Sequence, residues 1–457
     1  KSLDNWVLSP QLTNLNYMFW EATRFNQPLV NWVTTNIKSL IGTFRKARDF
    51  NQDLSTWDVS EVTRMDKLFY GAASFNGNID NWQVQKVIRL SETFRDATSF
   101  SRNISGWQTL KLQYMNFTFS NADSFNVDIN SWDVEEVVNM NYLFRETAIF
   151  DKPLNLWKTY KLKSTEGTFY KAQKFNRSLN DWDTDEVTTM KNMFYLAVEF
   201  NNGQSAGVSN TLSFNMSSVK NTQSMFFSAY KFNGHLSGWD LGEVTQMASM
   251  FRNSNWNNGA SAGVSTTLSW NVEKVQNMKD MFRDNSAFNA NISAWNPLSV
   301  LALYSTFQNA TAFNNGFPAG SAGTATISNT LDWNMPSLTS QNTRQRREWG
   351  LGSTFQGATA FNSYINNWNV SSIYSINYTF YGATSFNQPL DNWNVGNIEF
   401  MEYVFKDATS FNQPIGNWDV TSVGKFNSMF DGASTFDQDI SCWCVPNNPE
   451  RNNFSDA

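Results

Sequence analysis

Large aromatic residues recur along this chain at a fixed distance of 25 residues. The clearest series consists of tryptophans: Trp32, Trp57, Trp82, Trp107, Trp132, Trp157 and Trp182. After longer spacings the same position continues through Phe214, Trp239, Trp270, Trp295, Trp333, Trp368, Trp393, Trp418 and Trp443. A parallel series of phenylalanines runs from Phe19 to Phe430. A fixed period of this length is typical of a solenoid, and it predicts about sixteen stacked turns.

The first half of each turn has the spacing of a short helix. Within one turn, apolar residues follow one another at steps of three, four and three: Val62, Met65, Phe69 and Ala72. This spacing lines one face of a helix, and Ser60 lies where an N-cap is expected. The pattern therefore predicts a short helix that ends at the small pair Gly71-Ala72.

The second half of each turn predicts a short strand. After Gly71 the apolar residues include Ile79, Trp82 and Val84, and the last two alternate with polar residues. Such residues favour strands, and stacked strands would form a parallel sheet beside a continuous core. We therefore predict one α/β repeat solenoid domain over residues 1–457, with a short helix and a short parallel strand in every turn.

An asparagine follows the second phenylalanine of most turns. Its positions are Asn26, Asn51, Asn76, Asn126, Asn176, Asn233, Asn289, Asn362, Asn387 and Asn412. An amide at a bend can satisfy backbone groups of the adjacent turn, so this series predicts a hydrogen-bonded ladder.

Composition narrows the choice of partners. The formal charge of -6 and the pI near 5.1 argue against nucleic acid or anionic lipid as a general partner, because both attract basic surfaces. No apolar run approaches the 18 residues of a membrane span, so we expect no direct membrane insertion. The only cysteines, Cys442 and Cys444, lie at the C-terminal end, so no disulfide framework holds the body of the chain.

Several turns resemble the BspA-type leucine-rich-repeat surface proteins. Residues 408–420, A-T-S-F-N-Q-P-I-G-N-W-D-V, match that family's pattern M-F-x-x-A-x-x-F-N-x-x-L-x-x-W-x-V. The resemblance implies a right-handed leucine-rich-repeat-like superhelix with an adhesive or recognition role on a cell surface. It also implies that residues 442–457 form the C-terminal end of the repeat array.

Four insertions interrupt the repeat and are the candidate partner-binding segments. Three of them, 201–210, 257–265 and 314–329, carry a Ser-Ala-Gly element that begins at Ser205, Ser261 and Ser321, respectively. The fourth, 341–350, holds the concentrated cations Arg344, Arg346 and Arg347 with Trp349. Loops on a rigid scaffold are suited to binding, and Arg with Trp is typical of interfaces. The alternative for the three Ser-Ala-Gly loops is that they are tolerated additions without a function. The alternatives for 341–350 are a solvated surface loop and a basic processing site.

No constellation of side chains indicates catalysis. The one histidine, His235, occupies a variable position, without the residues of a nucleophilic triad around it. We therefore predict a non-enzymatic protein with no cofactor and no metal site. Glycosylation sequons occur at Asn103, Asn116, Asn176, Asn215, Asn291, Asn309, Asn369, Asn377 and Asn453, although an Asn-, Ser- and Thr-rich repeat generates such triplets by composition.

Together these features predict an extracellular or cell-surface adhesion and recognition module whose long repeat surface binds a protein or a glycan. The alternative is a structural subunit of an extracellular filament or coat, in which copies of the chain contact one another. An enzyme comes third, and a pocket lined by convergent titratable groups around His235 would favour it.

Overall fold

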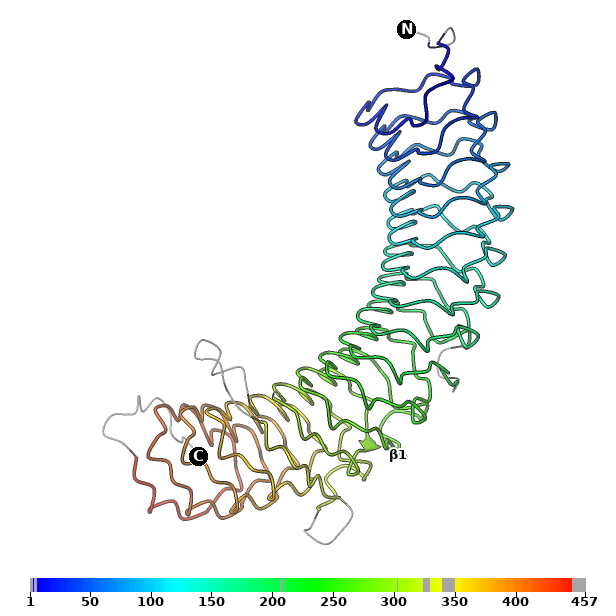
Figure 1. Cartoon of the computed structure of the whole chain (residues 1–457). Coiled ribbons are helices and arrows are strands. Elements are labelled where there is room, and N and C mark those ends of the chain that lie inside the picture. Colours follow the sequence, from blue (N-terminus) through cyan, green and yellow to red (C-terminus); the bar gives the residue numbers. More distant parts are fainter. Residues whose placement is uncertain are drawn as a thin grey trace. The chain divides into compact units, whose positions relative to one another are not determined.

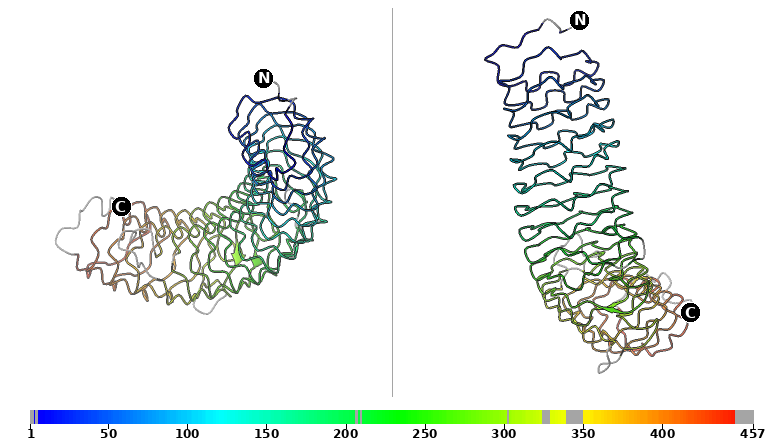
Figure 2. Two further views of the ribbon diagram at one scale, coloured as in Figure 1. Left: turned by 45° about the horizontal axis from the view of Figure 1, so that its top comes forward. Right: turned by 90° about the vertical axis from the view of Figure 1, so that its right-hand side faces the viewer.

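The computed structural model describes residues 3, 6–205, 208, 210–301, 303–323, 329–338 and 350–445. The chain divides into two compact units: Lys1–Ala206 with Leu212–Ser218 (unit 1), and Gly207–Thr211 with Val219–Ala457 (unit 2). Within each unit the chain winds through turns that lie side by side (Figure 1), and two further views show the same stacking (Figure 2). Each unit is thus a repeat solenoid, as the 25-residue period predicts.

The prediction of a helix in every turn is wrong. The described residues contain no helix, and residues 65–72 of the predicted helix form a succession of tight turns. In this segment the N–H groups of Leu68, Tyr70 and Ala72 donate to carbonyl oxygens three residues earlier, at 3.1, 3.2 and 3.0 Å. Consecutive turns of this kind bring residues three or four apart to the same side, which is why the apolar spacing resembled a helix.

Four other amides of this segment join it to the next turn. They donate to carbonyl oxygens in the pairs Met65–Arg89 (3.0 Å), Lys67–Ser91 (2.9 Å), Phe69–Thr93 (2.8 Å) and Gly71–Arg95 (2.8 Å). An α-helix over 62–72 would bond the amides of Lys67, Phe69 and Gly71 internally, so they could not reach the neighbouring turn. The stack therefore depends on the alternation between bonds within a turn and bonds between turns.

This alternation requires left-handed backbone at two positions in a turn. Lys67 has φ of 58° and Gly71 has φ of 69°, as the third residue of such turns demands. Gly71 adopts this conformation freely, whereas a side chain such as that of Lys67 costs about 1–2 kcal/mol there. The hydrogen bond that Lys67 donates to Ser91 helps to offset that cost.

The prediction of a strand in the second half of each turn is also wrong. The strands among the described residues are β1 (Thr266–Thr267) and β2 (Ala290–Asn291), which pair in parallel. Most other turns meet through parallel bridges one residue wide, such as Ser39↔Arg64 and Arg64↔Arg89 in unit 1. These bridges lie just before Met65 and its equivalents, at the start of the segment predicted to be helical.

Three columns of aromatic rings form the core of unit 1. Phe69 stacks on Phe94 at 5.7 Å between ring centroids, Phe75 on Phe100 at 6.1 Å, and Trp107 on Trp132 at 5.8 Å. Trp132 is only 2% exposed, so the prediction that the repeated tryptophans lie in the core is confirmed. The same columns continue in unit 2, where Trp418 stacks on Trp443 at 6.3 Å.

Polar ladders run beside the aromatic columns. The indole N–H of Trp132 donates to the carbonyl oxygen of Ile104 in the preceding turn (3.0 Å), and most repeated tryptophans do the same. The amide oxygen of Asn51 accepts the backbone N–H of Asn76 (2.8 Å), so the predicted asparagine ladder is confirmed. The indole ladder gives a buried polar atom its partner, which avoids the cost of burying it unpaired.

Replacing Trp132 with alanine should lower the free energy of unfolding by about 3–5 kcal/mol, because it opens a cavity in a packed column. Urea denaturation followed by tryptophan fluorescence would measure this loss. Trp132→Phe retains a ring and removes the indole donor, so its cost should be smaller. A loss below about 1 kcal/mol for Trp132→Ala would contradict the role given to this column.

Candidate functional site

Each Ser-Ala-Gly insertion begins with the same triplet, Asn-Asn-Gly, whose role was not predicted from the sequence. The triplets are Asn201-Asn202-Gly203, Asn257-Asn258-Gly259 and Asn314-Asn315-Gly316. In all three, the second asparagine is left-handed, with φ of 50°, 49° and 51°, and the glycine follows with φ of 84°, 81° and 81°. Asparagine and glycine tolerate this backbone best, so the triplet is a local signal for the bend that starts each loop.

Both asparagines of the triplet fasten the loop to the solenoid. In the second insertion the Asn257 side-chain N–H donates to the carbonyl oxygen of Ser261 (2.7 Å), and the Asn258 side-chain oxygen accepts the backbone N–H of Leu236 (2.8 Å). Equivalent bonds occur in the other two insertions. These asparagines are buried, so the base of each loop is a hydrogen-bonded part of the fold.

The two insertions of unit 2 lie together, and Asn289 joins them. The Asn289 side-chain N–H groups donate to the carbonyl oxygens of Gly263 (2.9 Å) and Phe317 (3.0 Å). Its side-chain oxygen accepts the backbone N–H groups of Asn314 (2.8 Å) and Gly316 (3.0 Å). We call residues 257–265 and 314–323 the loop platform. Asn289, which connects the two loops, was predicted as a member of the asparagine ladder and not as part of a site.

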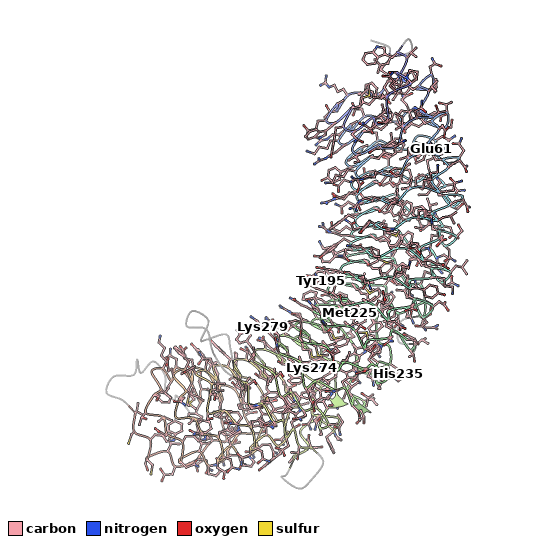
Figure 3. The ribbon with its side chains drawn as sticks, in the orientation of Figure 1. Glu61, Tyr195, Met225, His235, Lys274 and Lys279 are labelled. Carbon is pink, nitrogen blue, oxygen red and sulfur yellow. The ribbon has the colours of Figure 1, made fainter. Side chains whose placement is uncertain are left out.

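The structure thus brings together only some of the contact residues that were predicted from the sequence. Ser261 is exposed and Ser321 half-buried on the loop platform, whereas the exposed Ser205 belongs to unit 1. Arg344, Arg346, Arg347 and Trp349 lie outside the described residues, as does part of the 314–329 insertion. The His235 ring packs against Gly259, so the platform lies on the same side of unit 2 as His235. Figure 3 shows His235 on the opposite side of the stack from Lys279.

A second surface, in unit 1, was not predicted from the sequence. The residue directly after the repeated phenylalanine is aromatic or arginine in seven of eight successive turns: Trp20, Arg45, Tyr70, Arg95, Arg145, Tyr170 and Tyr195, with Ser120 at the remaining position. We call these seven residues the cation–aromatic row. Figure 3 labels its last member, Tyr195. Aligning the turns and comparing this one column would have revealed the row.

Neighbouring members of the row contact each other face to face. The Arg45 guanidinium carbon lies 5.3 Å from the Trp20 ring centroid and 5.2 Å from that of Tyr70. Arg95, one turn further on, lies 5.3 Å from the same Tyr70 ring. Tyr170 and Tyr195 stack at 4.6 Å between centroids. Such contacts contribute about 0.5–1 kcal/mol each at exposed sites, and here they order the side chains in two runs, one on each side of Ser120.

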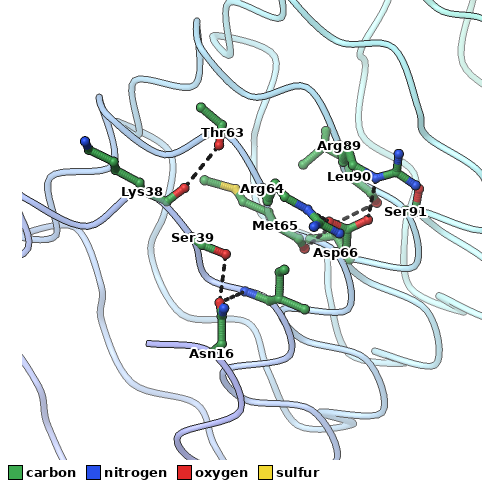
Figure 4. A network of polar contacts seen from close by, with 12 residues as sticks. Asn16, Lys38, Ser39, Thr63, Arg64, Met65, Asp66, Arg89, Leu90 and Ser91 are labelled. Carbon is green, nitrogen blue, oxygen red and sulfur yellow. Dashed lines mark hydrogen bonds and ion pairs between the residues drawn. The ribbon is translucent and has the colours of Figure 1, made fainter. Parts of the chain in front are cut away.

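Charged and polar groups beside the row are largely paired between turns. Asp66, only 7% exposed, accepts hydrogen bonds from Nε of Arg64 and Nε of Arg89, both at 3.0 Å (Figure 4). In the same view, the Asn16 side-chain oxygen accepts the Ser39 hydroxyl at 2.8 Å. The Asp66–Arg89 and Asn16–Ser39 bonds link adjacent turns, so the polar side chains reinforce the stacking of the backbone.

The pKa shifts near the row follow from burial and from the neighbouring charges. Burial alone would raise the pKa of Glu146, but the hydrogen bond from Lys171 and the charge of Arg145 outweigh it and lower that pKa. The pKa of Asp123 is raised, first by burial and then by the nearby carboxylates Asp96 and Glu146. The lowered carboxyl pKa keeps Glu146 charged as an ion-pair partner.

The described residues offer no evident catalytic or metal centre. No group of three or more His, Cys, Asp or Glu side chains with metal-binding geometry occurs among them. His235 is exposed and contacts the platform glycine Gly259. A cavity of about 420 Å³ lies in the first turn, lined mainly by apolar residues such as Trp6, Met18 and Phe25 with Arg24. Nor does the described part of the chain contain a helix that could cross a membrane.

A comparison with protein families identifies the repeat. Residues 1–107, 88–207, 153–263, 196–317, 258–335 and 349–456 match the model described as "Mycoplasma protein of unknown function, DUF285". The chain belongs to this family. The overlapping matches reflect the 25-residue period of the DUF285 chain, since the model fits at several registers. The BspA-type motif is a finer assignment than this match and stays a prediction.

Other comparisons add little about the DUF285 chain. No curated protein matches its sequence. Among solved structures, the "Crystal structure of TLR13-ssRNA13 complex" is similar over 85% of this chain and 54% of that chain, with 10% identity and a TM-score of 0.23. The DUF285 chain therefore spans about half the length of that chain. At this TM-score the likeness bears on neither fold nor function.

The predicted glycosylation sites differ in accessibility. Asn103, Asn215, Asn309 and Asn369 are exposed, Asn116, Asn176 and Asn291 are half-buried, and Asn453 lies outside the described residues. Asn377 is 6% exposed, and its side chain both donates to and accepts from Glu402. Burial disfavours Asn377 as a glycan acceptor, and the exposed sequons remain predictions.

Asn289→Asp should loosen the loop platform, because it removes the two side-chain N–H donors and retains the acceptor oxygen. We expect a loss of about 1–3 kcal/mol in stability and faster amide hydrogen exchange in 257–265. Asn387→Asp is the control, since the Asn387 side-chain oxygen accepts hydrogen bonds from the next turn, whereas its side-chain N–H groups donate to no described residue. Equal exchange rates in both variants would show that Asn289 does not hold the loops.

Proposed function

We propose that this DUF285 chain is a non-enzymatic recognition scaffold, outside the cell or on its surface, that binds a protein partner along unit 1. The resemblance to BspA-type leucine-rich-repeat surface proteins supports an adhesive role and an extracellular location. The observation that carries the proposal is the cation–aromatic row, which presents aromatic or arginine side chains in seven of eight successive turns. Tyr, Trp and Arg are the residues enriched among those that dominate binding energy at protein interfaces.

The stacking within the row favours a polypeptide over a glycan. Sugars bind aromatic residues by lying on an open ring face. In the row, Arg45 and Arg95 approach the Tyr70 ring from the turns before and after it, and Tyr195 stacks on Tyr170. What remains for a ligand are ring edges, tyrosine hydroxyls and guanidinium groups, which suit the mixed apolar and polar contacts of a protein interface.

A pair of matched tyrosine variants tests the proposal. The full chain would be screened against protein and glycan arrays at physiological salt, and the affinity for each protein ligand measured with Tyr170→Ser and Tyr160→Ser. Tyr160 is 51% exposed but lies outside the row. We expect Tyr170→Ser to weaken binding about tenfold, a loss of about 1.4 kcal/mol, and Tyr160→Ser to leave it within twofold.

Three outcomes would overturn this proposal: no protein ligand, ligands confined to glycans, or equal effects of the two tyrosine variants. Thermal unfolding of both variants separates lost binding from lost folding. Sedimentation of the same preparations tests the alternative of a filament or coat subunit, which predicts self-association at high concentration. A strictly monomeric chain would exclude that alternative.

The loop prediction from the sequence is tested by the same binding assay. Deleting residues 260–262 while keeping Asn257, Asn258 and Gly259, or changing Arg346 and Arg347 to Ser, should weaken binding and preserve the fold, because surface loops contribute little to the core. Full affinity in both variants would show that the insertions are tolerated additions that play no part in binding.

A further inference from the structure

The three arginines of the cation–aromatic row differ in their ion pairing. Arg95 contacts the Glu92 carboxylate at 3.0 Å, and Arg145 contacts the Glu146 carboxylate at 3.2 Å. Arg45 makes no side-chain hydrogen bond and no ion pair with any described residue. The row therefore holds one guanidinium whose charge is not directly matched by a carboxylate.

Arg45 is also held between two rings, as Arg95 is between Tyr70 and Phe117. Its guanidinium carbon lies 5.3 Å from the Trp20 ring centroid and 5.2 Å from that of Tyr70, in the turns before and after it. Its Nε is buried without a hydrogen-bond partner, while the side chain as a whole is half-buried. The donors left for a ligand are the two terminal amino groups, whose plane is set by the flanking rings.

The neighbouring charges leave a local excess of positive charge at Arg45. The adjacent cation, Lys46, is paired with Glu21 at 2.9 Å. The pKa of Glu21 is lowered chiefly by the hydrogen bond from Lys46, and the charge of Arg45 is a smaller cause. Two cations thus face one carboxylate, although the whole chain carries a formal charge of -6. At physiological ionic strength that distant charge is screened beyond about 8 Å, so the local excess decides what binds.

We infer that Arg45, clamped between Trp20 and Tyr70, anchors a carboxylate from an acidic polypeptide segment. A planar guanidinium with two parallel N–H donors matches the two oxygens of a carboxylate. The two rings hold the guanidinium in place, so little side-chain freedom is lost when the carboxylate binds. The inference rests on the proposed protein-binding function and names the chemistry of the partner.

Binding of a defined probe to the full chain tests this site. Isothermal titration at 150 mM salt would compare a ten-residue oligoglutamate with oligoglutamine of the same length, which lacks the charge. We expect the glutamate peptide to bind, the glutamine peptide to bind at least tenfold more weakly, and bound glutamate peptide to change Trp20 fluorescence. Because other tryptophans also emit, the fluorescence change is taken as the difference between wild type and Trp20→Phe.

Substitutions at Arg45 separate charge from geometry. Arg45→Gln should weaken glutamate-peptide binding at least tenfold, and Arg45→Lys should recover only part of it, because lysine keeps the charge and loses the planar fork. Lys158→Gln is the matched control, since Lys158 is exposed, has no ion-pair partner among the described residues and lies outside the row. It should change affinity by less than twofold. Circular dichroism of each variant checks that the fold is kept.

Unchanged binding by Arg45→Gln, or equal losses in Arg45→Gln and Lys158→Gln, would overturn the inference. Polygalacturonate, an acidic glycan, is titrated in parallel; tight binding to it that depends on Arg45, without binding of oligoglutamate, would reject a polypeptide partner. Failure of the inference and failure of the proposed function are distinguishable. A protein ligand from the array that Tyr170→Ser weakens and Arg45→Gln does not would leave the proposed function standing alone.

Discussion

The structure depends on which carbonyl oxygens the backbone N–H groups of one short segment bond to, those of the same turn or those of the next turn. In residues 67–72 and their equivalents, alternate N–H groups bond within the turn, and the others reach carbonyl oxygens of the next turn. This division needs left-handed backbone, even at residues such as Lys67, and it holds adjacent turns at a constant offset. The aromatic columns, the indole ladder and the asparagine ladder all use that offset, since each links equivalent positions in consecutive turns.

The same offset determines what the surface presents. Residues 25 apart become neighbours, so a side chain that would be isolated in another fold gains contacts on both sides. Tyr70 is the clearest case, because arginines from the preceding and following turns contact its ring. A repeat protein can therefore build an ordered file of side chains on its surface from one position per turn, without forming a pocket.

The insertions show where this regularity can be interrupted. The three Ser-Ala-Gly insertions leave the turn at the same point, immediately after the ladder asparagine, through a left-handed asparagine and a glycine. The ladder bond is kept, and the second asparagine supplies an acceptor for an amide of the preceding turn. The loops can thus differ in length while the stack continues. In unit 2, Asn289 then ties two loops to each other, which places two separate insertions in one platform.

Sequence alone determined the repeat, the buried tryptophans and the asparagine ladder, because a strict period forces equivalent residues such as Trp107 and Trp132 into one column. It did not reveal the local backbone, because consecutive turns and a short helix share the spacing of Val62, Met65 and Phe69. Only the tertiary structure decided between them, through amides that bond to the next turn instead of the same one. An alignment of the turns can reveal the composition of the cation–aromatic row, but the contacts within the row and the role of Asn289 emerged only in three dimensions, since they join residues 25 or more positions apart.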